Sequence, residues 1–446
     1  MAWKAAACLF PPTPYKRYRP RPSDFHSAFE RYLEPSPKRP TDDLYTTAVQ
    51  KVSEWLNLPK IKPLHLNDSM ARFPHPEKSP GLPYTREGIR KKADVPPSRV
   101  RSFVHQLKYG LITNIRTPCT AAARTTVATV DKFRLIWVYP CNVTMAEGMF
   151  AQPLIEAFLS WRTPYALWVQ YGKGHMKWLA SQRRSRRQKW ISLDWSNFDA
   201  NVPAWLIRDA FGILYAKFDL SAYEGWGRPT DDHTLPRLWK RLVHYFINTP
   251  MKFPGGEVRV KAKGVPSGSY FTNIIDTVCN AIACLYILMK MGLQSHQVTP
   301  WFLGDDALML VPGLVDLQAF AQYATDVFGF KLNAAKSSVG DTFSFLGYGS
   351  TPSGVPIADY NKLLAQLLLP DAPDRSLDDF VIRARALQLS CFGVGCPEFV
   401  KLVDDTLQDF PAGSGTLHPR DELVYKMHQL GLSDWPPLTL VWCLVG

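Results

Sequence analysis

The pattern of hydrophobic and polar positions predicts strands in the middle of the chain and buried helices beside them. Residues 126–139 and 190–195 are rich in Val, Ile and aromatic side chains, which favours extended structure. A helix is expected to start near residues 201–203. Residues 272–288 are long and mostly apolar, which is typical of a buried helix, here expected to end near Gly292.

A hairpin is predicted further along the chain. Two apolar segments, 299–303 and 307–311, are joined by Gly304, Asp305 and Asp306. Glycine allows the tight backbone that such a turn requires. Two adjacent carboxylates are therefore expected at a turn between apolar strands.

The remaining pattern is mostly helical. Helices are expected at 44–56 and at about 314–328, the second ending at Gly329, and residues 343–354 predict a further hairpin. From about residue 361 the pattern is helical, and the chain closes with an apolar tail at 438–445. The first 75 or so residues alternate basic and proline-rich pieces, which we interpret as an arm around a larger body.

The composition favours a large enzyme with an anionic partner. The chain has 446 residues, 46% of them hydrophobic, which excludes disorder for most of it. The formal net charge of +13 favours nucleic acid ahead of a membrane surface, with ordinary colloidal charge as the alternative. No signal peptide is expected, nor any stretch of about 18 uncharged apolar residues, so no membrane span is expected. We expect a soluble, intracellular protein.

Cysteines and basic residues add two further expectations. Eight cysteines are scattered without CxxC spacing, which argues against a zinc site or a disulfide framework. Most are expected to be packed thiols in a reducing compartment. Residues 183–189, RRSRRQK, leave two interpretations open: a solvated face or localisation-like signal, or a track for nucleic acid.

Carboxylates are the candidate chemistry. Asp305 and Asp306 oppose each other's ionisation unless a cation compensates them. In nucleotidyl transfer, two metal ions ~3.5–4 Å apart activate the attacking hydroxyl and stabilise the leaving pyrophosphate, so carboxylates must converge from separate strands. Asp194 ends a hydrophobic strand and is the candidate partner, with Asp199 five residues later. An isolated Asp-Asp turn is ordinarily a solvated loop, so the prediction depends on the combination.

A third element is the loop at 264–272, which runs directly into the apolar helix. Its glycines and the hydroxyls of Ser267 and Thr272 suit a close approach to a nucleotide. The alternative is a helix start capped by the Ser267 side chain.

Taken in order, these pieces resemble a known family. Asp194-x4-Asp199, Ser267-Gly268-x3-Thr272 and Gly304-Asp305-Asp306 are similar to motifs A, B and C of viral RNA-dependent RNA polymerases. SPGLPY at 79–84, KFRLIWVYP at 132–140, GVPSGSYFT at 264–272 and FLGYGS at 345–350 resemble polymerases of partitiviruses and picobirnaviruses, double-stranded RNA viruses, with the partitivirus side favoured. The resemblance covers about residues 79–350.

The resemblance implies roles for the acids and for the 264–272 loop. Asp194 and Asp305 would ligate two magnesium ions, for which manganese could substitute, and Asp306 would support them. Asp199, Ser267, Gly268 and Thr272 would surround the incoming ribose. Asp276 stands where many polymerases of positive-strand viruses have Asn, with Asn273 and Asn280 nearby, which leaves the contacts to the 2′ hydroxyl open.

The resemblance also implies roles for cations. Lys132 and Arg134, two residues apart in a strand-like segment, leave the same face and match motif F, a channel for triphosphate, with Arg124 as a further member. Exposed charges on an edge strand are the alternative. Lys336 falls where motif D places a proton donor for pyrophosphate, with Lys331 as its competitor and surface charge as the alternative.

The fold that the resemblance implies is α+β, a right-hand polymerase with an antiparallel palm sheet flanked by helices. The expected sub-domains are an N-terminal arm at 1–75, fingers at 76–189 with motifs G and F, palm at 190–215 with motif A, a fingers insertion at 216–260, palm at 261–355 with motifs B to E, and thumb at 356–446.

The implied function is RNA synthesis on an RNA template from ribonucleoside triphosphates. The expected partners are template and product RNA and a viral capsid protein, without a membrane, in the virion interior and host cytoplasm. One alternative is a reverse transcriptase, against which Asp199 argues, because those enzymes place a bulky aromatic residue there. Another is an inactive RNA-binding or packaging protein with a polymerase fold.

Overall fold

The structure is a computed structural model that describes residues 13–124, 126–130, 132–370, 374, 376–392 and 394–408. The first residues of the expected arm, with Cys8, and the apolar tail at 438–445, with Cys443, lie outside these ranges. The six other cysteines are buried free thiols.

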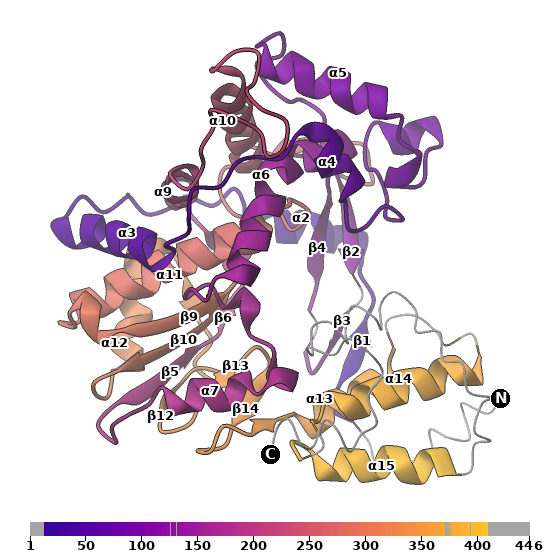
Figure 1. Ribbon diagram of the computed structural model, residues 1–446. Coiled ribbons are helices and arrows are strands. Elements are labelled where there is room, and N and C mark those ends of the chain that lie inside the picture. Colours follow the sequence, from indigo (N-terminus) through magenta and orange to yellow (C-terminus); the bar gives the residue numbers. More distant parts are fainter. Residues whose placement is uncertain are drawn as a thin grey trace.

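A four-stranded antiparallel sheet forms one side of the molecule (Figure 1). Its strands, in spatial order, are β12 (Ser338–Gly340), β5 (Lys189–Leu193), β10 (Asp306–Val311) and β9 (Thr299–Leu303). Along β10, Met309 and Val311 pack into one hydrophobic cluster, while Leu308 and Leu310 pack into another. Because successive side chains of a strand point to opposite faces, both faces of the sheet are buried.

The predicted hairpin and the predicted buried helix are both confirmed. Strands β9 and β10 pair directly, and β10 begins one residue earlier than expected, because Asp306 already pairs with Leu303. Gly304 has φ +63°, in the left-handed region that favours glycine. Helix α11 (Thr272–Lys290) packs against both strands and ends before Gly292.

Helix α11 also bears on the expectation about membrane spans, which stays a prediction. The helix has 19 residues, and an 18-residue window of it has a mean hydropathy of 1.5, so by length and composition alone it is long and apolar enough to cross a membrane. However, 83% of the apolar window is buried inside the protein, as in the core helix of a folded domain. The polar residues in the first turns of the helix interrupt its apolar run, but the mean hydropathy of the window stays high enough to meet the criterion for a membrane span.

A second four-stranded sheet stands beside the first in Figure 1. Its order is β4 (Arg134–Val138), β2 (Cys119–Arg124), β7 (Pro250–Lys252) and β8 (Val258–Val260). The N-terminal segment joins this region, because β1 (Lys16–Tyr18) pairs with β3 (Thr126–Ala128). The extended structure expected at 126–139 is therefore present as β3 and β4.

Helices surround the two sheets (Figure 1). They include α2 (Pro22–Glu30), α3 (Asp43–Trp55), α4 (Leu66–Ala71), α5 (Pro97–Lys108), α6 (Cys141–Ser160), α7 (His175–Ser181) and α10 (Thr234–Ile247). Helix α3 confirms the helix expected at 44–56. The helix expected near 201–203 is divided at Pro203 into α8 (Phe198–Asn201) and α9 (Ala204–Tyr215).

The helix expected at 314–328 begins later than its pattern predicts. Helix α12 (Leu317–Tyr323) starts after Asp316, whose carboxylate accepts the backbone N–H groups of Gln318 and Ala319. A π-helical turn, Ala324–Phe328, continues it and ends at Gly329, as expected. The apolar Leu314 is thus left outside the helix, where it is 77% exposed.

The C-terminal region is a separate group of helices at the lower right of Figure 1. Helices α13 (Tyr360–Leu368), α14 (Leu377–Leu389) and α15 (Pro397–Gln408) share one hydrophobic cluster. The hairpin expected within 343–354 extends to Ile357, where β14 (Tyr348–Ser350) pairs with both β13 (Ser344–Phe345) and β15 (Pro356–Ile357).

Candidate active site

Acidic side chains meet at one end of the central sheet. Strands β5 and β10 run antiparallel with Leu193 opposite Ala307, so Asp194 emerges beside the start of β10. Asp306 is the first residue of β10, and Asp305 lies in the turn before it. The structure therefore brings together the three acids that the sequence singled out.

Burial and mutual repulsion act on these acids. Burial is the main cause that raises the pKa of Asp305, with Asp194 adding to it, whereas Arg134 and Lys132 oppose the shift. Burial, followed by Asp305 and Asp194, raises the pKa of Asp306 to about 7. Like charges held this close favour either protonation or a bound cation.

Asp194 is held by the segment that precedes β12. The side-chain amide of Asn333 donates to Asp194 Oδ2 at 2.8 Å, and the Asn333 N–H donates to the Asp194 carbonyl at 2.8 Å. The Asp194 N–H donates to Ser337 Oγ at 3.1 Å. Sequence reasoning missed Asn333 and Ser337, although both lie in the polar stretch that contains Lys336.

The turn that carries Asp305 is held from behind by helix α11. Thr277 Oγ1 accepts the Gly304 N–H at 2.8 Å. Asn280 donates to the carbonyls of Gly304 and Asp305 at 3.1 and 3.0 Å, and its Oδ1 accepts Trp195 Nε1 at 3.0 Å. Sequence reasoning missed Thr277 and noted Asn280 only as a neighbour of Asp276, and the signal of both was polarity at buried positions of an apolar helix.

The 264–272 loop lies against strand β4. Ser267 Oγ accepts the Trp137 N–H at 3.3 Å, and a Cβ at Gly268 would lie 1.8 Å from the Trp137 carbonyl oxygen. Only glycine fits there. The alternative that Ser267 caps α11 is wrong, because the helix begins at Thr272 without a side-chain cap.

Two side chains fix the shape of this loop. The Thr272 hydroxyl lies 2.7 Å from the Pro266 carbonyl oxygen and 2.8 Å from the Ser269 carbonyl oxygen. It therefore donates its hydrogen bond to the backbone of the loop. The fully buried Glu147 of α6 accepts hydrogen bonds from the Ser269 hydroxyl at 2.9 Å and from the Tyr270 N–H at 2.8 Å. Burial raises the pKa of Glu147 to about 8.

Three buried polar side chains, Asp199, Asp276 and Tyr32, lie next to the acids and are called here the buried polar group. Burial and then the charge of Asp305 raise the pKa of Asp199 to about 6. Burial raises the pKa of Asp276 well above its ordinary value, and its Oδ1 has no hydrogen-bond partner among the described residues. Tyr32, from the N-terminal segment, is buried here, and the charge of Asp199 adds to burial in raising its pKa.

Arg134 at the start of β4 and Lys132 just before it are cations that act on Asp305, and Lys336 lies in the turn after β11 (Lys331–Leu332). Burial lowers the pKa of Lys132, as do Arg134 and Lys336, while Asp194 and Asp305 oppose the shift. Arg124 pairs with Arg134 across the strands. Lys331 instead pairs with Ser196 across β6 (Trp195–Ser196). Lys336 thus interacts electrostatically with Lys132, a neighbour of the acids, whereas Lys331 interacts with Lys263.

The donor set fits a divalent cation that takes further ligands from a substrate. Among the described residues, no three His, Cys, Asp or Glu side chains are arranged to hold a metal ion by themselves. The three carboxylates nevertheless interact electrostatically, and burial raises the pKa values of Asp305 and Asp306. Magnesium is commonly bound by one or two carboxylates together with substrate phosphates and water.

Comparison with known proteins shows the family. A sequence model of viral RNA-dependent RNA polymerases matches residues 23–390. The chain belongs to this family. Among curated relatives, the RNA-directed RNA polymerase of Cryptosporidium parvum virus 1 is 33% identical over 199 residues, covering 43% of this chain and 35% of that protein. The RNA-directed RNA polymerase of White clover cryptic virus 1 is 26% identical over 212 residues, covering 42% and 34%.

Solved structures agree on the fold. The RNA-dependent RNA polymerase of a human picobirnavirus superposes with a TM-score of 0.67 at 16% identity, covering 92% of this chain and 77% of that one. The expected right-hand fold, with an antiparallel sheet flanked by helices, is confirmed, as is the resemblance to the partitivirus and picobirnavirus type. The chain spans about a third of the length of the two curated relatives.

Proposed function

We propose that this family member extends RNA on an RNA template by joining ribonucleoside triphosphates, with two magnesium ions as cofactors. The observation that carries the proposal is the convergence of Asp194, Asp305 and Asp306 at one end of the central sheet, facing Lys132 and Arg134. Acids beside cations match a reaction in which metal ions and triphosphate meet at one point.

Asp194 and Asp305 would hold the ions, and Asp306 would support them. When bound, the ions would activate the attacking 3′ hydroxyl and stabilise the leaving pyrophosphate, and manganese could replace magnesium. The contacts of Asn333 with Asp194 and of Asn280 with the Asp305 carbonyl support this assignment, because they fix the acids before substrate binds.

The cations would bind the triphosphate. Arg124 and Arg134 lie side by side on neighbouring strands, and a guanidinium can bind phosphate oxygens with two parallel hydrogen bonds. Lys132 and Arg134 both interact electrostatically with Asp305. Lys336 would donate a proton to the departing pyrophosphate.

The buried polar group would bind the ribose. Asp199 offers an acceptor for a 2′ hydroxyl, and Asp276 has a carboxyl oxygen without a partner among the described residues. Ser267 and Gly268 would shape the loop, which lies against β4. Thr272 would act through the loop backbone, because its proton is already used there.

The expected sub-domains are part of this proposal. The central sheet would be the palm, the β2–β4 region and residues 216–260 the fingers, and the helices after residue 356 the thumb. A capsid protein as partner, and the virion interior and host cytoplasm as locations, remain predictions from the sequence resemblance.

The test is incorporation of labelled nucleotides by the purified chain on RNA and DNA templates. Asp305→Asn and Asp194→Asn are expected to abolish incorporation while leaving RNA binding intact. Asp326→Asn, an exposed acid beyond α12, removes the same charge and is expected to retain activity. Full activity of the Asp305 variant would contradict the proposal.

The same assay separates the alternatives. Incorporation of deoxyribonucleotides in preference to ribonucleotides would indicate a reverse transcriptase. RNA binding without any incorporation, across magnesium and manganese concentrations, would indicate an inactive RNA-binding protein with this fold.

A further inference from the structure

The basic run at 183–189 lies at the opposite end of strand β5 from Asp194. It forms the turn between α7 and β5, and Lys189 is the first residue of that strand. At a rise of about 3.3 Å per residue, the five residues of β5 put roughly 15 Å between this turn and the acids. The turn is therefore separate from the catalytic residues proposed above.

Hydrogen bonds between its own residues hold the turn in shape. The side-chain oxygen of Gln188 accepts the backbone N–H groups of Arg184 and Ser185 at 2.9 and 3.1 Å. Arg183 donates to the carbonyls of Gln188 and Arg186 at 2.8 and 3.1 Å. Ser185 Oγ accepts the backbone N–H of Arg187 at 3.2 Å. The backbone of the turn is thus fixed by its own side chains.

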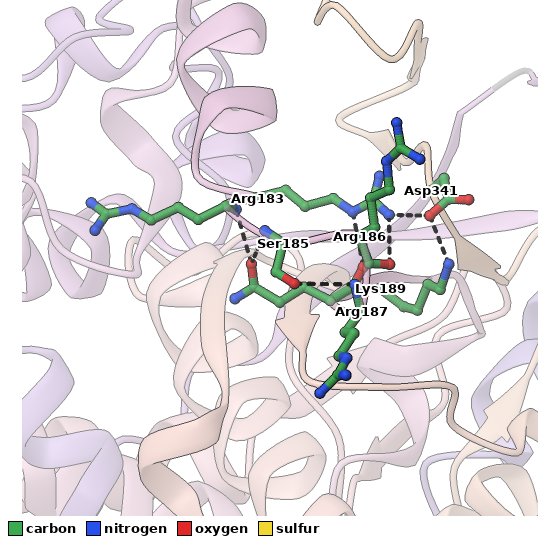
Figure 2. Close-up of polar contacts among 8 residues, drawn as sticks. Arg183, Ser185, Arg186, Arg187, Lys189 and Asp341 are labelled. Carbon is green, nitrogen blue, oxygen red and sulfur yellow. Dashed lines mark hydrogen bonds and ion pairs between the residues drawn. The ribbon is translucent and has the colours of Figure 1, made fainter.

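Asp341 neutralises only part of the charge. Figure 2 shows Arg183 and Lys189 converging on Asp341, and both form ion pairs with it. The three other arginines, Arg184, Arg186 and Arg187, are exposed. None of these three forms an ion pair within the part of the chain that the structure describes. The turn therefore carries five cationic side chains, and only two of them pair with this carboxylate.

We propose that Arg184, Arg186 and Arg187 form a binding surface for RNA phosphates outside the catalytic centre. Guanidinium groups bind phosphate oxygens through two parallel hydrogen bonds, and the fixed turn presents three exposed ones that form no ion pair with the described residues. Such contacts hold a strand without reading its sequence. The surface would hold template RNA before it enters the centre or product RNA after it leaves.

The chemistry of the turn favours RNA over a protein partner. Protein interfaces usually contain a buried aromatic or aliphatic side chain at their centre. Residues 183–189 offer only arginine, lysine, serine and glutamine. The inference rests on the proposed function, because a chain that copies RNA must also guide RNA toward and away from its active site.

The test compares two triple variants of the full chain. One carries Arg184→Ala, Arg186→Ala and Arg187→Ala. The control carries Lys62→Ala, Arg208→Ala and Lys240→Ala, three exposed cations outside this turn, so that both variants lose the same net charge. Affinity for single-stranded and double-stranded RNA is measured by fluorescence anisotropy between 50 and 300 mM salt. Over this range the Debye length falls to less than half of its starting value.

The arginine variant is expected to bind RNA about 10-fold to 100-fold more weakly, with the slope of log affinity against log salt reduced by about 2 to 3. The control is expected to keep most of the wild-type slope, and nucleotide incorporation at saturating template is expected to stay unchanged in both. Leu314→Ser, which alters an exposed apolar side chain near the same end of the sheet, is expected to leave RNA binding unchanged.

Equal RNA affinities for the two triple variants would overturn the inference, as would an equal loss in Leu314→Ser. Nucleotide incorporation by the wild type separates this failure from that of the proposed function. A wild type that synthesises RNA while the arginine variant binds RNA normally contradicts the inference alone. A wild type that neither binds nor copies RNA contradicts both.

Discussion

The side-chain amide of Asn280 lies 3.0 Å from the backbone carbonyl oxygen of Asp305, so the buried helix α11 directly holds the turn that carries the proposed metal ligands. The same side chain accepts a hydrogen bond from Trp195, the residue after Asp194. One amide thus links the two acid-bearing segments. In metal sites, groups behind the ligands commonly control how well the ligands are positioned.

Asn280→Ala is expected to lower the rate of nucleotide incorporation about 10-fold to 100-fold. It would also lower the free energy of unfolding by about 1–3 kcal/mol, because two carbonyls and the Trp195 indole N–H lose their partner. Steady-state incorporation and urea denaturation measure the two effects.

Ile282→Val on the same helix is the control. It should cost about 0.5–1.5 kcal/mol of stability through lost packing, without touching the turn. Equal losses of rate in the two variants would show that stability, and not the position of Asp305, determines the effect of Asn280.

Glu147 predicts a pH dependence of stability. Its pKa is raised to about 8 from an ordinary value of 4.5, so the folded state holds a proton that the unfolded state releases at lower pH. The stabilising contribution is therefore complete below about pH 4.5 and is lost as pH rises through about 8. Relative to Glu147→Gln, which cannot ionise, the wild type is expected to lose about 1 kcal/mol per pH unit between pH 5 and 8.

Chemical denaturation of both proteins at several pH values measures this difference. The Gln variant also disturbs the contacts to Ser269 and Tyr270, so its absolute stability is expected to be lower at acidic pH. Only the slope tests the prediction. Parallel stability curves for the two proteins would contradict it.

Much of the central sheet was predictable, because its strands are short apolar runs separated by turn residues. The hairpin around Asp305 and helix α11 were placed correctly from local pattern alone. The start of α12 was not placed correctly. The apolar Leu314 fits the helical pattern and was therefore included in the helix, but the helix begins only after Asp316, which caps it. Local pattern cannot distinguish an apolar residue that packs from one that is exposed.

The catalytic residues proposed from sequence lie together, but the residues that hold them were missed. Asn333 and Glu147 lie far along the chain from the groups they contact, and neither belongs to a short motif. Such partners follow from how distant elements pack. Tyr32 is a further example, because nothing in the N-terminal arm indicated that it would be buried beside Asp199.

The choice of sugar is expected to depend on Asp199 and, more weakly, on Tyr32. Asp199→Ala removes the acceptor for the 2′ hydroxyl, so the preference for ribonucleotides in kcat/KM is expected to fall about 10-fold, the equivalent of one charge-assisted hydrogen bond. Tyr32→Phe removes one buried hydroxyl near Asp199 and should reduce the preference about threefold to fivefold.

Tyr45→Phe is the matched control, because the Tyr45 hydroxyl is also buried and donates to Asp209 at 2.7 Å, outside the proposed ribose site. It is expected to keep the wild-type preference. Competition between a ribonucleotide and its deoxy analogue on one template measures all three. An unchanged preference in Asp199→Ala would show that the proposed ribose contact is wrong.

Lys336 and Lys331 can be separated by substitution. Lys336 acts electrostatically on Lys132, which in turn interacts with Asp194 and Asp305, whereas Lys331 is paired with β6. Lys336→Ala is therefore expected to lower kcat by at least about 10-fold, with KM nearly unchanged, because general acid catalysis acts on the transition state. Lys331→Ala is expected to keep kcat within about twofold of the wild type.

Lys336→Arg decides what Lys336 does. Arginine keeps the positive charge, but its pKa above about 12 makes it a poor proton donor at neutral pH. If Lys336 protonates pyrophosphate, Arg should not restore kcat, and the solvent isotope effect on single-turnover incorporation should change in both variants. Restoration of kcat by Arg would mean that Lys336 contributes only charge, which would leave the leaving group to take its proton from water.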